Sequence, residues 1–159
     1  MQEGIESYLL KNYYLCCNKI FLQLNNKNSN FMTELKRPIS TTNAPAAIGP
    51  YSQAIQAGHL LFLSGQLGID PATGDFVPGA VSEQTEQVFK NIRAVLAEAR
   101  LTLDNVVKTT VFLSDMADFA AMNAMYDKYF TQPYPARSTI AVKTLPKNGL
   151  VEIEVVAVK

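Results

Sequence analysis

The segment that most constrains this fold is the last one, residues 151–158, which has the pattern of a β-strand with two apolar faces. Its residues alternate between the set Val151, Ile153, Val155 and Ala157 and the set Glu152, Glu154, Val156 and Val158. A strand of this kind is typical of a sheet that is covered on both sides. The chain offers two helical segments, which suffice for one face. We therefore expect neighbouring copies of the chain to cover the other face.

The other segments supply the remaining elements of an α+β domain. Gly58-His59 separates two strand-like runs and predicts a hairpin turn. Pro133 and Pro135 follow the second helical pattern and end it. The expected elements are strands at 52–57, 60–65, 106–113 and 138–142, a helix capped by Ser82 and running to about Ala99, and a helix from about Asp118 to Phe130.

The composition changes near Met32 and divides the chain. Residues 1–31 are rich in Asn and Lys, and residues 25–30 resemble a polar linker. We interpret 1–31 as an extension, disordered or partly helical, or as sequence upstream of a true start at Met32. An appended helix or a weak targeting segment remains the alternative. Residues 32–159 then form the folded domain.

Charge and cysteine content narrow the classes of partner and compartment. Fourteen basic and fourteen acidic residues give a formal net charge of zero, which argues against nucleic acid and anionic membranes as partners. No run reaches the roughly 18 apolar residues that span a bilayer. The two cysteines, Cys16 and Cys17, are adjacent and too few for a disulfide framework, so we expect a cytoplasmic protein.

Several kinds of catalytic site are excluded within residues 32–159. This part contains no Cys and a single His, His59, which lies in the expected hairpin turn. A protein zinc site and a nucleophile–His dyad or triad therefore lack their residues. No Gly-x-Gly-x-x-Gly or Walker-type loop is present to hold phosphates.

Two charged residues lie in apolar surroundings and are the first candidates for chemistry. Arg137 follows Pro133-Tyr134-Pro135-Ala136 at the start of a strand. Its guanidinium suits a carboxylate, because two parallel N–H bonds match the two carboxylate oxygens. Glu152 could hold a water molecule and transfer a proton if burial raises its pKa. The alternatives are a surface arginine and a solvated or ion-paired glutamate.

Three further polar residues are weaker candidates. Tyr51 could close an apolar pocket and offer its hydroxyl, although such a tyrosine more often packs in the core. Ser64, at a strand end, and Asn123, in a helix, usually serve local hydrogen bonds. Taken singly, none of these residues identifies a function.

The order of the motifs resembles the RidA/YjgF family over residues 38–159. The matching motifs are Ala46–Ala54 (AAIGPYSQA), Ser64-Gly65-Gln66, Gln84-Thr85-x-Gln87-x-x-x-Asn91, Val107–Leu113 with Asp115, Phe119-x-x-Met122-Asn123-x-x-Tyr126, Pro135-Ala136-Arg137-Ser138, Leu145-Pro146 and Val151–Ala157. Each motif alone is weak, whereas the ordered set is specific. Residues 1–31 lie outside it.

The resemblance implies a fold, an assembly and an activity. The fold would be a chorismate-mutase-like mixed sheet with two helices on one face. Three copies would form a central barrel-like core with an active site in each cleft between subunits. The activity would be hydrolysis of enamines and imines, such as 2-aminoacrylate and 2-iminobutanoate released by pyridoxal-phosphate enzymes, to 2-oxo acids and ammonia, without any cofactor.

The resemblance also assigns roles to positions in this sequence. Arg137 matches the carboxylate-binding arginine, and Glu152 matches the water-positioning glutamate. The positions that match substrate-pocket residues are Tyr51, Ser64, Asn123 and Thr139, the last of which often carries Cys in bacterial members. Two other functions stay open at this point: a module that binds a small carboxylate without turnover, and an activity directed at RNA, which the charge balance disfavours.

Overall fold

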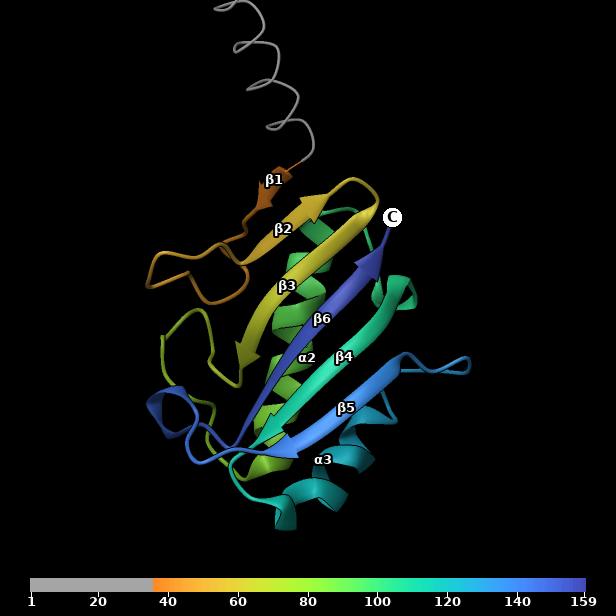
Figure 1. Cartoon of the computed structure of the whole chain (residues 1–159). Coiled ribbons are helices and arrows are strands. Elements are labelled where there is room, and N and C mark those ends of the chain that lie inside the picture. The colour runs from red at the N-terminus through yellow and green to blue at the C-terminus, as the bar shows by residue number, and fades with distance from the viewer. Residues whose placement is uncertain (1–35) are drawn as a thin grey trace, which may run out of the picture. The chain divides into compact units, whose positions relative to one another are not determined.

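The protein is represented by a computed structural model, in which residues 36–159 are described and six strands form one mixed sheet (Figure 1). The expected extension 1–31 and residues 32–35 lie outside the described range. The strand order is β1-β2-β3-β6-β4-β5. The elements are β1 (Lys36–Ile39), β2 (Ala54–Ala57), β3 (Leu60–Leu67), α2 (Val81–Glu98), β4 (Val106–Leu113), α3 (Phe119–Tyr126), β5 (Ala136–Ala141) and β6 (Val151–Val158).

The predicted two-faced strand, β6, lies inside the sheet between β3 and β4 and is antiparallel to both. One of its faces is fully in the core, with Val151, Ile153, Val155 and Ala157 each at most 2% exposed. Helices α2 and α3 lie together behind this face of the sheet (Figure 1). The mixed sheet with two helices on one face is therefore confirmed.

The other face of the sheet is open to solvent in a single chain and is apolar. Large apolar side chains that are 38% to 48% exposed come from four strands of the sheet: Leu60, Phe62, Val107, Ile140 and Val158. Apolar side chains on this scale are more often covered by protein than left in water. That other copies of the chain cover this face stays a prediction.

Two predicted helix boundaries were wrong, for local reasons. Helix α2 begins at Val81, and its cap position is Ala80 instead of Ser82. The Ala80 N–H donates to Glu83 Oε2 (2.8 Å), so an acidic side chain inside the first turn ties down the cap residue, which has no side-chain acceptor of its own. Helix α3 ends at Tyr126, because the chain continues in tight turns before Phe130 enters the core.

The strands were predicted more closely than the helix ends. The hairpin turn at Gly58-His59 is confirmed, since Ala57 pairs with Leu60, and β4 and β6 have the predicted bounds. Strand β5 starts at Ala136, earlier than predicted, and β1 was not predicted. Within residues 36–159 no helix is both long and apolar enough to cross a membrane.

Strand β5 runs parallel to β4 and forms an edge of the sheet, with α3 in the connection between them. This register places Arg137 opposite Thr109 and Thr139 opposite Val111. Thr109 and Val111 are fully buried on the helix side. The crossover therefore brings residues of β5 beside α3, as the hydrogen bond between Arg137 and Asn123 shows.

Asn91 on α2 connects the helix to the loop that follows β3, and its replacement tests this connection. Its side-chain amide donates to the carbonyls of Leu67 (3.0 Å) and Ile69 (2.9 Å), and the residue is 1% exposed. We expect Asn91→Ala to lower the free energy of unfolding, because each carbonyl left unsatisfied in the core costs about 1–3 kcal/mol. Urea denaturation measures the change. Arg93→Ala, an exposed position of the same helix, is the control and should leave the midpoint unchanged.

Candidate functional site

Three of the six predicted site residues line one cavity on the open face of the sheet. Tyr51, Ser64 and Glu152 surround a space of about 660 Å³. Ligand pockets generally have volumes of about 300–1,000 Å³. Most of the wall is apolar and comes from the 45–51 loop, the end of β3 and the loop before β6, with Pro45, Ile48, Leu67, Ile69 and Pro146 among its members.

A β-bulge in β3 shapes the middle of this cavity. Leu63 pairs with Val155 and Gln66 pairs with Ile153, so three residues of β3 advance against two of β6. The extra residue falls at Ser64-Gly65, and bulges of this kind commonly redirect side chains beside active sites. The Ser64 hydroxyl donates to the Ser52 carbonyl (2.7 Å), which is distant in the chain, so this is not the local hydrogen bond expected of a strand-end serine. The side chain also lines the cavity.

Gly65 makes room for the carboxyl group of Glu152. A Cβ atom at position 65 would overlap this carboxyl group, so any side chain there would displace it. Glu152 is half-buried, and its removal from water raises its pKa, with a further contribution from the negative charge of Glu154. A carboxyl group with a raised pKa is suited to accept and return a proton near neutral pH.

Another part of the cavity wall is fixed by a buried glutamine, Gln53, that the sequence did not single out. Gln53 Oε1 accepts from the Thr41 N–H (2.7 Å), and Gln53 Nε2 donates to the carbonyls of Thr41, Ala44 and Pro45 (3.0, 3.3 and 2.8 Å). Gln53 is 3% exposed. These bonds replace regular secondary structure in the loop and hold it in place beside the cavity. Tyr51 follows this loop and is half exposed, so it is not a core aromatic.

Lys147 was also missed and contributes the cation in this wall. It lines the cavity and its Nζ donates to the Gly74 carbonyl (3.1 Å). Its backbone has φ of 55°, a conformation that residues other than glycine adopt uncommonly. A lysine in a short loop gives no periodic signal, and only the neighbouring Leu145-Pro146 motif marked the segment.

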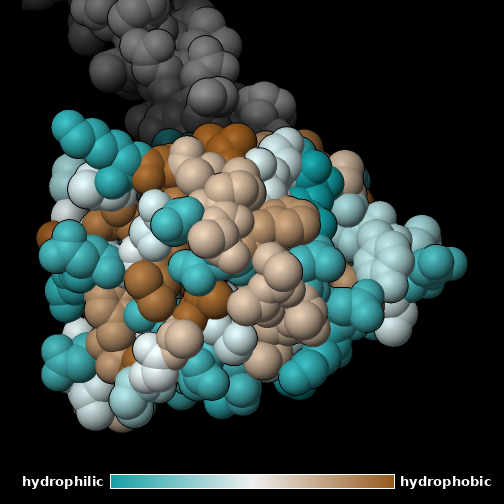
Figure 2. Space-filling model, turned by 90° about the horizontal axis from the view of Figure 1, so that it is seen from below, coloured by the Kyte–Doolittle hydropathy of each residue, from teal (hydrophilic) through white to brown (hydrophobic). Residues whose placement is uncertain are grey.

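The remaining predicted site residues form a second group, at the edge strand β5 and helix α3. The Arg137 Nη2 atom donates to Asn123 Oδ1 (2.8 Å). The guanidinium also lies 4.4 Å from the ring centre of Tyr126 and 5.8 Å from that of Phe119. Viewed from below, the end of the domain that carries α3 shows apolar residues framed by hydrophilic ones (Figure 2). Arg137 has no carboxylate partner among residues 36–159, because the single ion pair in this range is Lys90–Glu86.

Thr139 belongs to the second group by its register. It lies two residues after Arg137 on β5, so both side chains are on the same face of the strand. Its Oγ1 is buried and has no hydrogen-bond partner among the described residues. Since buried hydroxyl groups nearly always have a partner, this atom is available to a bound molecule or water.

A single chain does not bring the two groups together. Arg137 pairs with Thr109 and faces the helices, whereas Glu152 pairs with Phe112 and faces the open side of the sheet. Within one chain the cavity and the arginine therefore lie on opposite faces of the sheet.

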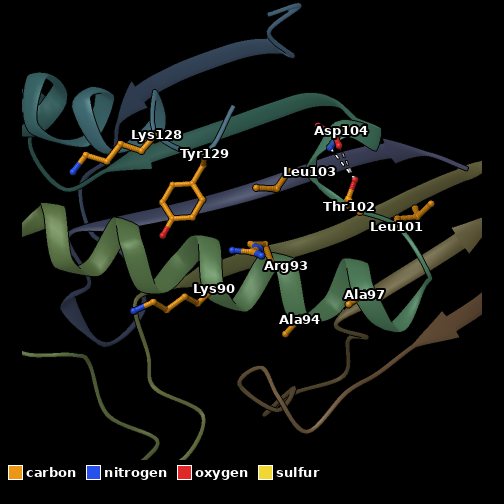
Figure 3. A pocket seen from close by; sticks show the side chains of 10 residues that line it. All are labelled: Lys90, Arg93, Ala94, Ala97, Leu101, Thr102, Leu103, Asp104, Lys128 and Tyr129. Atoms are coloured by element: carbon orange, nitrogen blue, oxygen red, sulfur yellow. Dashed lines mark hydrogen bonds between the residues drawn. The ribbon is translucent and has the colours of Figure 1, made fainter. Parts of the chain in front are cut away.

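A second cavity of similar size, about 670 Å³, lies on the outer side of α2 (Figure 3). Lys90, Arg93 and Lys128 line it together with Tyr129, and Ala94 and Ala97 form part of its floor. None of the six predicted residues lies there. The three cations of this second cavity are exposed to solvent. The two cavities have similar volumes, so we choose the first one as the candidate site because of the residues that line it. Among residues 36–159 no cluster of three or more His, Cys, Asp or Glu side chains could hold a metal ion.

Comparison with known proteins identifies a matching family and close relatives. A family model described as endoribonuclease L-PSP matches residues 41–159. A mouse protein named 2-iminobutanoate/2-iminopropanoate deaminase is 49% identical over 125 residues, which are 79% of this chain and 93% of the mouse protein.

Solved structures agree with this result. RidA from an Antarctic Psychrobacter has a TM-score of 0.75 and 45% identity, covering 77% of this chain and 99% of its own. TdcF of E. coli, whose crystal structure contains bound serine, has a TM-score of 0.73 and 38% identity, covering 77% of this chain and 98% of its own.

The raised pKa of Glu152 predicts a pH-dependent effect of Glu152→Gln on stability. The folded wild type holds its proton to higher pH than the unfolded chain, so its stability falls as pH rises above the ordinary value of 4.5. Glutamine does not titrate. We therefore expect Glu152→Gln to gain stability relative to wild type between about pH 4 and pH 7. Denaturation at both pH values measures this, with the exposed Glu98→Gln as control. An equal difference at the two pH values would contradict the burial of this carboxyl group.

Proposed function

Because this chain belongs to the family of the endoribonuclease L-PSP and RidA proteins, we propose that it hydrolyses 2-imino acids and their enamine forms to 2-oxo acids and ammonia. The observation that carries the proposal is Arg137, a partly exposed guanidinium held only by neutral groups. Such a cation keeps its charge for the carboxylate that every 2-imino acid carries.

The chemistry requires one cation, one proton carrier and one water molecule. Protonation of the enamine carbon gives an iminium ion. Water, deprotonated by Glu152 as it attacks, adds to the iminium carbon and forms a carbinolamine. The carbinolamine nitrogen takes the proton that Glu152 accepted from water and leaves as ammonia. The C–N bond breaks as the carbonyl forms, and the hydroxyl proton passes to the Glu152 carboxylate. Fixing the carboxylate and the water in one geometry supplies much of the acceleration.

The substrate would bind between neighbouring copies of the chain in a homotrimer. The apolar open face of the sheet supports an assembly, since its exposed Phe62, Ile140 and Val158 would become buried there. The same assembly would let the cavity with Glu152 on one copy meet Arg137 on the next. The isolated chain holds Arg137 and the cavity with Glu152 on opposite faces of the sheet, so a site that uses both requires contact between two copies.

Removal of either charged group tests the reaction. Arg137→Ala should lower turnover by about 30-fold to several thousand-fold, because it removes one partner of a desolvated ionic contact. The assay supplies the imine from a threonine dehydratase, with semicarbazide as competing trap, and follows the formation of 2-oxobutanoate. Arg93→Ala, an exposed arginine on α2, is the matched control. Wild-type activity in Arg137→Ala would contradict the proposed function.

Glu152→Gln separates an enzyme from a protein that only binds small carboxylates. The amide keeps the shape of the side chain and cannot accept the proton, so we expect a loss of about 100-fold or more in turnover. Binding of 2-oxobutanoate, measured by calorimetry, should persist in this variant. Equal turnover in wild type and Glu152→Gln would favour the binding function.

Mixing two inactive variants tests whether two copies share each site. A trimer assembled from equal amounts of Arg137→Ala and Glu152→Gln chains should have about a quarter of its clefts intact, since a cleft needs an intact arginine from one copy and an intact glutamate from its neighbour. Co-expression of the two chains with different tags provides the mixed trimers. Activity no greater than that of the separate variants would place both residues of a site in one chain.

An RNA-directed activity is the second candidate, and the description of the matching family model is the observation that favours it. The zero net charge argues against it, because RNA affinity is dominated by contacts between cations and phosphates. A titration with single-stranded RNA at several salt concentrations would reveal it. A cytoplasmic location remains a prediction from the sequence.

A further inference from the structure

Arg137 has the torsional freedom of any arginine, yet its guanidinium is confined on two sides. Its Nη2 is held by Asn123, and one face of its plane is held by the ring of Tyr126 at 4.4 Å. Phe119 is a more distant neighbour at 5.8 Å. Cations within about 6 Å of an aromatic ring centre are attracted by its π electrons. Tyr126 is therefore the main support for one face of this cation.

The ring of Tyr126 is itself held by the core and by a hydrogen bond to the sheet. It is 4% exposed and packs against Phe89, with ring centres 5.6 Å apart, and against Phe130 at 4.7 Å. Its hydroxyl shares a hydrogen bond with Thr109 Oγ1 (2.9 Å), and Thr109 is fully buried. A ring held by packing and by a hydrogen bond at its far end has little freedom to tilt or slide.

The hydrogen bond joins helix α3 to the strand position that pairs with Arg137. Thr109 on β4 is the register partner of Arg137 on β5. Tyr126 thus spans from the helix to the sheet directly beneath the arginine side chain. A shift of α3 along the sheet would move the ring and the guanidinium together.

We propose that Tyr126 is a positioning residue that holds Arg137 for the substrate carboxylate. The inference rests on the proposed function, because it assigns to Arg137 the carboxylate of a 2-imino acid. The ring restricts the guanidinium plane, and the N–H groups that Asn123 does not engage remain available in that plane. A carboxylate needs two parallel N–H donors, so a fixed plane favours it over an uncharged carbonyl.

Two substitutions at Tyr126 separate the ring from its hydroxyl. Tyr126→Leu removes the aromatic face, and we expect the Kd for 2-oxobutanoate and the KM for the imine to rise by about 3- to 30-fold, with kcat much less affected. Tyr126→Phe keeps the face and should stay within a few-fold of wild type. Calorimetry measures the Kd, and the coupled dehydratase assay measures the kinetic constants.

Tyr129→Leu is the matched control for damage to the core. Tyr129 also packs against Phe89, here with stacked rings whose centres are 4.4 Å apart, but makes no cation contact with Arg137. It should lower the Tm and leave the Kd for 2-oxobutanoate unchanged. Equal weakening of binding by Tyr129→Leu and Tyr126→Leu would overturn the positioning role.

A double-mutant cycle tests whether Tyr126 acts through Arg137. In an Arg137→Gln background, Tyr126→Leu should cause no further loss of 2-oxobutanoate binding, measured by ligand-observed NMR at high ligand concentration. Additive losses, or wild-type binding by Tyr126→Leu alone, would overturn the proposal. If wild type binds 2-oxobutanoate without turning over imines, the proposed function fails while the positioning role stands. If wild type does not bind 2-oxobutanoate, the positioning role fails too.

Discussion

The burial of one face of β6 is the constraint on which the rest of the structure depends. Val151 and Ile153 are fully buried beneath the helices, and this burial fixes which side chains point the other way. A slip of one residue in the register would turn every side chain of the strand to the opposite face. Glu152 is therefore directed to the open face by the packing of its neighbours, and its place in the cavity follows from the hydrophobic core.

Departures from regular strand pairing then make room for the carboxyl group of Glu152. The bulge at Ser64-Gly65 interrupts the pairing of β3 with β6, and Gly65 leaves the volume that the Glu152 side chain occupies. Gln53 holds the neighbouring loop through backbone carbonyls that a strand would otherwise satisfy. The cavity is thus formed where the sheet pattern is broken, and one of its walls is supported by the buried Gln53 side chain and its hydrogen bonds to the loop.

The sequence predicted the parts of the fold that depend on periodic burial and missed those that depend on single contacts. The two-faced pattern of β6 and the β-branched run of β4 gave correct bounds, because their alternation reflects packing over many residues. The cap of α2 was misplaced, since the helix begins after Ala80, whose N–H donates to the Glu83 side chain. The roles of Tyr126 and Gln53 could not be predicted, because each depends on which distant segments meet in space.

The separation of Arg137 from Glu152 within one chain has a chemical consequence. Had both side chains shared a face of one chain, they could have formed an ion pair, lowering the pKa of the carboxyl group and occupying the guanidinium. The observed arrangement leaves Arg137 with an amide and aromatic rings as partners, and leaves Glu152 in apolar surroundings that raise its pKa. The guanidinium therefore stays without a carboxylate partner among residues 36–159, and a carboxyl group with a raised pKa is suited to accept and return a proton. Because the two side chains lie on opposite faces of the sheet, neither neutralises the other within one chain.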